Sequence, residues 1–197
     1  MNTEELPGSA GEHEMQKKFG TKEKAKDFYD KQMLDYLSPH MQSFIQTQEM
    51  VFVATSDKNG ECDNSIRTGE AGFVVVIDEK TIVYADFKGN GVLASAGNIS
   101  ENPHIGMLFV DFFEDKVGLH VNGKASLFSD SQFLSFLGKK NLLNKKPILN
   151  QKISFWVVID IEEAYIHCSR NIPLLKKNDD IKAITKSRVV DYFKLGS

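Results

Sequence analysis

The spacing of apolar residues changes once along this chain, near residue 49. Before that point the apolar side chains of TKEKAKDFYDKQMLDYL recur at spacings of three and four, which predicts a helix beginning at Thr21. Ser38 followed by Pro39 predicts the start of a second short helix through HMQSFIQTQ, because Ser caps helices and Pro fits their first turn. We expect residues 1–20 to form a flexible or loosely docked arm.

From residue 50 short apolar runs alternate with turn signals, which indicates β-structure. MVFVAT and CDNSIRT are joined by an Asn-Gly turn, GFVVVID and IVYADF form a second hairpin, and HIGMLFVDFF and VGLHVNGKASLF form a third. We expect helices over 91–99 and 130–146, and ISFWVVIDIEEAYIHCS is one long strand or two broken ones. This order favours a mainly β fold, an antiparallel barrel or sandwich with peripheral helices, over a doubly wound parallel sheet.

Composition narrows the class of protein. The chain has 197 residues, 41% of them hydrophobic, and we divide it into the arm 1–20, N-terminal helices 21–48 and a barrel domain 49–197 with a C-terminal extension. The N-terminus is unlike a signal or transit peptide and no apolar run could cross a bilayer, so we expect a cytoplasmic protein without a membrane partner. A formal net charge of −3 gives a nucleic-acid role no support.

The segment YADFKGNG followed by VLASAGNIS holds the most suggestive chemistry. It places Lys88, Gly89, Asn90 and Ser95 between the end of a strand and the start of a helix. Backbone N–H groups are free at a helix N-terminus, where the helix dipole adds positive potential. Together with a lysine and close-approaching glycines, this is chemistry for holding a phosphate. A plain Gly-Asn turn is the alternative interpretation.

Several motifs follow one another in an order that resembles a known family. SIRTGEAGF, YADFKGNG, NISENPHIGMLFVDF and LHVNGKASL, in this sequence, resemble the pyridoxamine 5′-phosphate oxidase-like flavoproteins, the FMN-binding split barrels. The resemblance is close over about residues 40–128 and extends to EEAYIHCSRNIP. It implies a barrel of six or more antiparallel strands and a homodimer formed across a broad sheet face. It also implies FMN as the cofactor, bound in clefts between the subunits.

The resemblance also implies which residues bind the cofactor. The family's Arg at the place of Arg67 reaches the phosphate or the flavin edge, and the backbone of Thr68 and Gly69 meets the ring. Arg67 shares a strand face with Ser65 and Asp63; the alternative is a solvent-exposed Arg67 paired with Glu70. Asn98, one turn after Ser95, either shares its face or caps the helix end. The full expected set is Arg67, Thr68, Gly69, Ala85, Asp86, Lys88, Gly89, Asn90, Ser95 and Asn98.

Two departures separate this chain from the biosynthetic oxidases of that family. Those enzymes carry an Arg-Lys pair in the helix where this chain has Leu93-Ala94-Ser95. They also close the active site with a C-terminal Arg-Leu-His-Asp-Arg-like motif, whereas Arg188 is the only arginine here beyond Arg170. We therefore expect no oxidation of pyridoxamine 5′-phosphate, and Arg170 is the best remaining candidate for a substrate contact.

The remaining reactive side chains predict little chemistry. His167 and Cys168 are adjacent on a strand and point to opposite faces, so we do not expect a catalytic dyad. Cys62 and Cys168 are far apart and are expected to be reduced thiols, and no residues have metal-ligand spacing. We expect His120 at the surface or barrel end, and Trp156 in core or interface packing.

Two classes of function fit these expectations. The first is a flavin-dependent oxidoreductase acting on an unidentified small molecule, with its catalytic residues unknown. The second is a non-catalytic flavin-binding or redox-sensing protein. A split barrel that holds a deazaflavin or haem is a further alternative, with His120 or His167 as the axial ligand of a haem.

Overall fold

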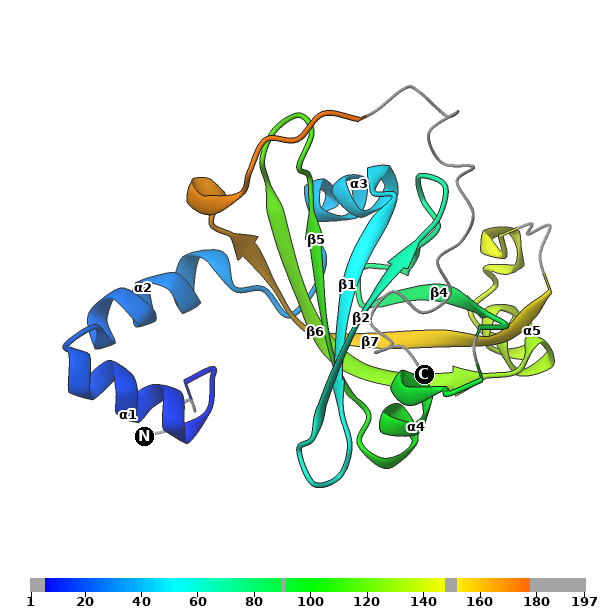
Figure 1. Cartoon of the computed structure of the whole chain (residues 1–197), viewed down its shortest axis with the longest axis horizontal. Coiled ribbons are helices and arrows are strands. Elements are labelled where there is room, and N and C mark those ends of the chain that lie inside the picture. The colour runs from blue at the N-terminus through cyan, green and yellow to red at the C-terminus, as the bar shows by residue number, and fades with distance from the viewer. Residues whose placement is uncertain (1–5, 90, 148–151, 178–197) are drawn as a thin grey trace, which may run out of the picture.

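The computed structural model describes residues 6–89, 91–147 and 152–177 of the chain. Its centre is a seven-stranded antiparallel sheet in the order β2-β1-β5-β6-β7-β4-β3, curved around a single interior (Figure 1). β2 and β3 stand at the two ends of this order, which leaves the barrel split between them. The predicted mainly β split barrel is therefore confirmed. The strands are β1 (Met50–Ser56), β2 (Cys62–Thr68), β3 (Val75–Asp78), β4 (Thr81–Phe87), β5 (His104–Val110), β6 (Gly118–Phe128) and β7 (Ile153–His167).

The strands pair as the turn signals predicted. β1 with β2, β3 with β4 and β5 with β6 form the three expected hairpins. The last strand is one long element, and β7 pairs with both β6 and β4, so it joins the two halves of the barrel. The β6–β7 register shifts between Asn122 and Gly123. A Cβ on Gly123 would stand 2.1 Å from the Asp160 carbonyl oxygen, so only glycine fits where the strands bend.

Two apolar clusters fill the fold. The larger one occupies the barrel interior and includes Val53, Tyr84 and Phe109. The smaller one lies under α5 (Asp130–Lys139) and centres on Trp156, which is fully buried and donates its indole N–H to Asp130 Oδ1 at 3.0 Å. The helix expected over 130–146 ends early, and a short 3-10 turn, η1 (Leu143–Lys145), follows it. Asn141 adopts a positive φ of 57° at this break, which an α-helix does not tolerate.

The N-terminal helices differ most from expectation. The expected arm contains a helix, α1 (Ala10–Phe19), with Ser9 as its N-cap and Gly20 as its left-handed C-cap. No residue of α1 is buried, so the apolar periodicity that predicts most helices is missing there. α2 (Lys22–Gln32) stops five residues before the end of the predicted helix, because the backbone of Leu34 pairs with Ala164 on β7. α1 and α2 form a helical hairpin that projects from the barrel in Figure 1.

The remaining two helices lie against the barrel. α3 (Pro39–Thr47) begins at Ser38 and Pro39, as predicted, and the Ser38 side chain accepts from the Met41 N–H. α4 (Ala94–Glu101) begins three residues later than expected, because Leu93 has a left-handed backbone with φ of 55°. A final 3-10 turn, η2 (Ser169–Asn171), follows β7. Within the described residues, no helix has the length and apolar character needed to span a membrane.

Candidate functional site

The edge strand β2 presents a row of polar side chains on its inner face. Asp63, Ser65 and Arg67 lie opposite the buried positions of β1, whereas Ile66 between them is exposed on the other face. This alternation is the one predicted from the period of two along a strand. β2 is an end strand of the sheet, and α4 packs against β2 and its neighbour β1.

Three elements of the fold meet at this row. Ser95, in the first turn of α4 and only 7% exposed, donates to Asp63 Oδ2 at 3.2 Å. Its Oγ also lies 3.4 Å from Ser65 Oγ and accepts from Arg67 Nη2 at 3.5 Å. Arg67 Nη2 lies 3.1 Å from Asp86 Oδ2 on β4. We call these five residues the Arg67 cluster, and it brings together Arg67, Asp86 and Ser95 of the expected set.

The ion pair between Arg67 and Asp86 decides between two interpretations of the arginine. The side chains are 27% and 18% exposed, so the pair is partly buried. The alternative of a solvent-exposed Arg67 paired with Glu70 is therefore wrong. A partly buried guanidinium that is held by a carboxylate and a hydroxyl has few conformations, which suits it to bind an anion in one geometry.

Two buried polar atoms, one in the cluster and one beside it, have no hydrogen-bond partner among the described residues. Arg67 Nε and the Tyr84 hydroxyl make no hydrogen bond within the part of the chain that the structure describes. Burial raises the pKa of Tyr84 to about 12, although the neighbouring Arg67 guanidinium acts to lower it, so the phenol stays neutral near pH 7 and lies beside the arginine. Leaving a buried donor unsatisfied costs about 1–3 kcal/mol, and such atoms often mark a place where a ligand or water completes the bonding. The free Nε of Arg67 fits an acceptor oxygen, such as one of a phosphate.

The start of α4 adds positive potential near the same place. Leu93 occupies the N-cap and has no side-chain oxygen, so it provides no side-chain cap for the first-turn N–H groups. Lys88 is exposed on the segment between β4 and α4. The cluster itself holds two carboxylates against one guanidinium. Lys88 and the helix N-terminus are therefore needed to offset the carboxylates if a dianion binds here.

Other residues of the expected set lie elsewhere. Thr68 follows Arg67 on β2 and points to the opposite, exposed face. The Ala85 side chain packs against the smaller apolar cluster under α5. It therefore points to the opposite face of β4 from the Asp86 side chain. Asn98 shares the face of α4 that carries Ser95. Its Nδ2 donates to Thr55 Oγ1 at 3.1 Å, and Thr55 on β1 is the cross-strand neighbour of Asp63, so this bond ties α4 to β1 beside the cluster.

The glycines of the set have different explanations. A Cβ on Gly69 would stand 2.5 Å from the Cβ of Phe73, so packing within the chain already requires glycine there. A Cβ on Gly89 would meet nothing within 4 Å. Asn90 lies outside the described residues.

A histidine pair on the outer sheet face was not predicted. His120 Nε2 lies 2.9 Å from His167 Nδ1, and the His120 ring stacks on Tyr165 at 4.7 Å between centroids. Burial, and then the facing His167, lower the pKa of His120. The two histidines are 47 positions apart, so only the β6–β7 register could have revealed the pair. Cys62 and Cys168 are exposed free thiols.

The fold and the Arg67 cluster define a split-barrel protein with a polar site where β2, β4 and α4 meet. The chain belongs to the pyridoxamine 5′-phosphate oxidase family, whose model matches residues 37–168. That range contains all of the Arg67 cluster and leaves out the helical hairpin.

Solved structures with a similar fold come from several bacteria. HupZ of Group A Streptococcus is 22% identical, with 66% of this chain and 93% of that chain covered and a TM-score of 0.48. An FMN-binding protein of Syntrophomonas wolfei is 18% identical, covering 79% and 96%, with a TM-score of 0.46. General stress protein 26 of Bacillus anthracis is 15% identical, covering 63% and 88%, with a TM-score of 0.42. No match was found among curated proteins. Likenesses at this level say nothing about the ligand of this chain.

Proposed function

We propose that this protein binds FMN at the Arg67 cluster and acts as a flavin-dependent oxidoreductase on a small molecule. The observation that carries the proposal is the state of Arg67. Its guanidinium is held by Asp86 and Ser95, yet its buried Nε has no acceptor among the described residues. Membership of the family supports a flavin at this part of the barrel.

The phosphate of FMN would lie between Arg67 and the first turn of α4. Arg67 would donate from Nε, and the uncapped N–H groups of α4 would donate from the other side. Lys88 adds a cation that offsets one of the two cluster carboxylates. In this arrangement Asp86 holds the guanidinium in place, and it also competes with the phosphate for it.

The outer face of the sheet supports a homodimer. Phe52 on β1 pairs with Ile66 on β2 and with Leu108 on β5, which makes an apolar row across three strands. Ile66 is 50% exposed in the single chain. An apolar sheet face beside an open edge requires cover, and a second copy supplies it in the arrangement that the family resemblance implies. Sedimentation showing a stable monomer at micromolar concentration would contradict this part of the proposal.

The chemistry would come from the cofactor, since bound FMN supplies hydride and electron transfer. The residues of the chain would bind and orient it, and no side chain is assigned as a general acid or base. A non-catalytic flavin-binding protein differs from an enzyme only in turnover. Rapid reduction of the bound flavin by a nicotinamide cofactor would favour the enzyme.

The visible spectrum of the purified protein is the first test. We expect flavin absorption bands, and FMN in the supernatant after heat denaturation. A Soret band, or failure of the apoprotein to bind added FMN, would refute the proposal. Haem binding is less favoured because the candidate axial ligands His120 and His167 hydrogen-bond to each other at 2.9 Å.

Vitamin B6 synthesis stays outside the proposal. Arg170 is exposed on η2, and Arg188 lies outside the described residues. A substrate phosphate taken from water needs its own cations, because its desolvation is otherwise uncompensated. We expect no pyridoxal 5′-phosphate formation at saturating FMN, and turnover of pyridoxamine 5′-phosphate would show this expectation to be wrong.

A further inference from the structure

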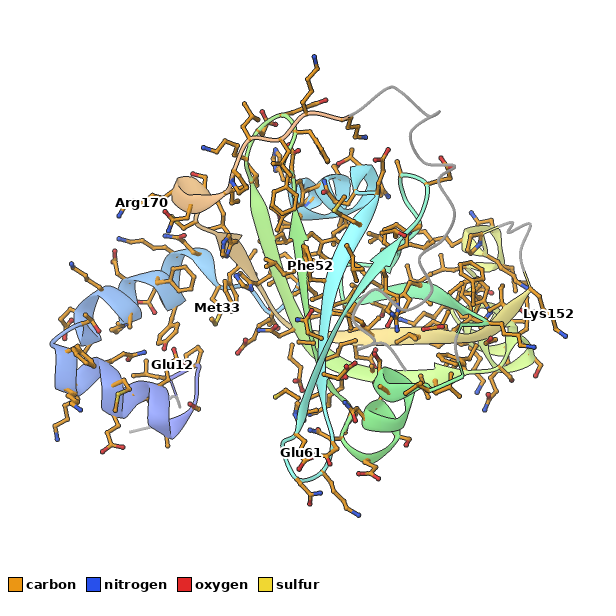
Figure 2. The ribbon with its side chains drawn as sticks, in the orientation of Figure 1. Glu12, Met33, Phe52, Glu61, Lys152 and Arg170 are labelled. Atoms are coloured by element: carbon orange, nitrogen blue, oxygen red, sulfur yellow. The ribbon has the colours of Figure 1, made fainter. Side chains whose placement is uncertain are left out.

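A cavity of about 540 Å³ lies between the helical hairpin and the outer face of β6 and β7. Figure 2 labels two residues of its hairpin side, Glu12 on α1 and Met33 just after α2. The hairpin precedes the family-matched range, so seven of the ten residues that line this cavity lie outside the family model. The cavity is lined by Gly8, Ser9, Glu12, Ala25, Phe28, Tyr29, Met33, Asn122, Glu163 and Tyr165.

The charged residues of this lining are two carboxylates, one from each side. Glu163 Oε2 accepts from Asn122 Nδ2 at 3.1 Å. Glu12 accepts from the Tyr29 hydroxyl and, at 3.2 Å, from Gln16 Nε2. Burial, and then the hydrogen bond to Glu12, raise the pKa of Tyr29, and the charge of Glu163 raises it further. The Tyr29 hydroxyl therefore lies in negative potential that comes from Glu12 on the hairpin side and from Glu163 on the sheet side of the cavity.

Aromatic rings form much of the remaining wall. Phe28 meets Tyr165 edge to face at 5.6 Å between centroids, and Tyr29 at 6.4 Å. Aromatic faces attract cations, and their area also binds apolar groups. An anion would be repelled by the two carboxylates. A bare metal ion is disfavoured, because no group of three or more metal-ligating side chains gathers within the described residues.

We propose that this cavity binds a small organic cation, a protonated amine attached to an apolar body. The ammonium lies between Glu12 and Glu163, and the body packs against Phe28 and Tyr165. The site is separate from the Arg67 cluster, because Glu163 is on the outer face of β7 while Arg67 faces inward from β2 at the sheet edge. It therefore goes beyond the proposed flavin function and does not depend on it.

Calorimetric titration with a matched pair of probes tests the site. 2-Phenylethylammonium carries the charge, and 2-phenylethanol has nearly the same size without it. We expect the cation to bind about tenfold more tightly, a factor that corresponds to about 1.4 kcal/mol. Glu163→Gln should weaken the cation about three- to tenfold and leave the alcohol unchanged. Glu14→Gln is the control, because Glu14 is an exposed α1 carboxylate outside the lining.

Three results would overturn the proposal. The two probes could bind equally, the Glu14 control could lose as much affinity as the Glu163 variant, or the wild type could bind neither probe at millimolar concentration.

If Glu163→Gln does not fold, Phe28→Leu takes its place, since it keeps the apolar area and removes the π face. That variant should weaken the cation more than the alcohol, and equal losses would count against the site. The flavin spectrum serves as an independent readout that none of these changes should move.

Discussion

Replacement of Arg67 by alanine tests the candidate flavin site most directly. Hydrogen bonds to a charged group contribute about 1.5–3 kcal/mol each. The Arg67 side chain is 27% exposed, so water replaces part of the loss and we expect about 2 kcal/mol. That value corresponds to about a 30-fold increase in the Kd for FMN. The change also removes the guanidinium that offsets Asp63 and Asp86 beside the phosphate, which acts in the same direction.

Flavin fluorescence quenching on the apoprotein gives the Kd. Riboflavin lacks the phosphate, so the loss should appear with FMN and largely vanish with riboflavin. Arg170→Ala is the matched control, because it removes an exposed arginine from η2. An Arg67 variant that is folded by circular dichroism and binds FMN within twofold of wild type would refute the phosphate assignment. Equal losses for FMN and riboflavin would refute it as well.

Three further predictions concern stability. Tyr84→Phe removes a buried hydroxyl that has no partner in the described part of the chain, so the apoprotein's free energy of unfolding should stay level or rise by up to about 1 kcal/mol in urea melts. Gly69→Ala places a methyl group 2.5 Å from the side chain of Phe73 and should cost about 1–3 kcal/mol in the same assay, whereas an unchanged midpoint would mean that the loop shifts freely. The pKa of His120 is lowered from 6.5 by burial and the facing imidazole. The unfolded state therefore binds this proton at a higher pH than the folded state does. The free energy of unfolding should fall as the pH drops through 6.5 toward the folded pKa. A His120→Gln variant should lose part of that pH dependence of the melting temperature, and an identical pH profile would contradict the assignment.

The predictable parts of the fold were those with local signals. The Asn-Gly turn and the alternating strands specified the hairpins, and Ser38 with Pro39 specified the start of α3. The helix α1 buries no side chain, so nothing in the apolar pattern marked it. The end of α2 is set by backbone pairing of Leu34 with a strand 130 positions later, at Ala164, and tertiary contacts of this kind override local helix preference.

The candidate site was predictable in part for the same reason. Arg67 and Ser95 stood out because of their own motifs, and strand alternation correctly placed Asp63 and Ser65 beside Arg67. The hydrogen bonds of Asp63 and Ser65 to Ser95 depend on how α4 packs against the sheet edge, and no local sequence pattern predicts that packing. The unpartnered hydroxyl of Tyr84 was missed because its position resembles ordinary core.

The edge position of β2 has a consequence for how the protein avoids aggregation. An open sheet edge offers unpaired N–H and C=O groups to any strand of another chain. A strand that added to β2 would have to desolvate the inward-pointing charges of Asp63 and Arg67, and this cost opposes its addition. The charges that we assign to ligand binding therefore also protect the edge. Apolar residues at both positions would be expected to turn this barrel into a template for intermolecular β-pairing.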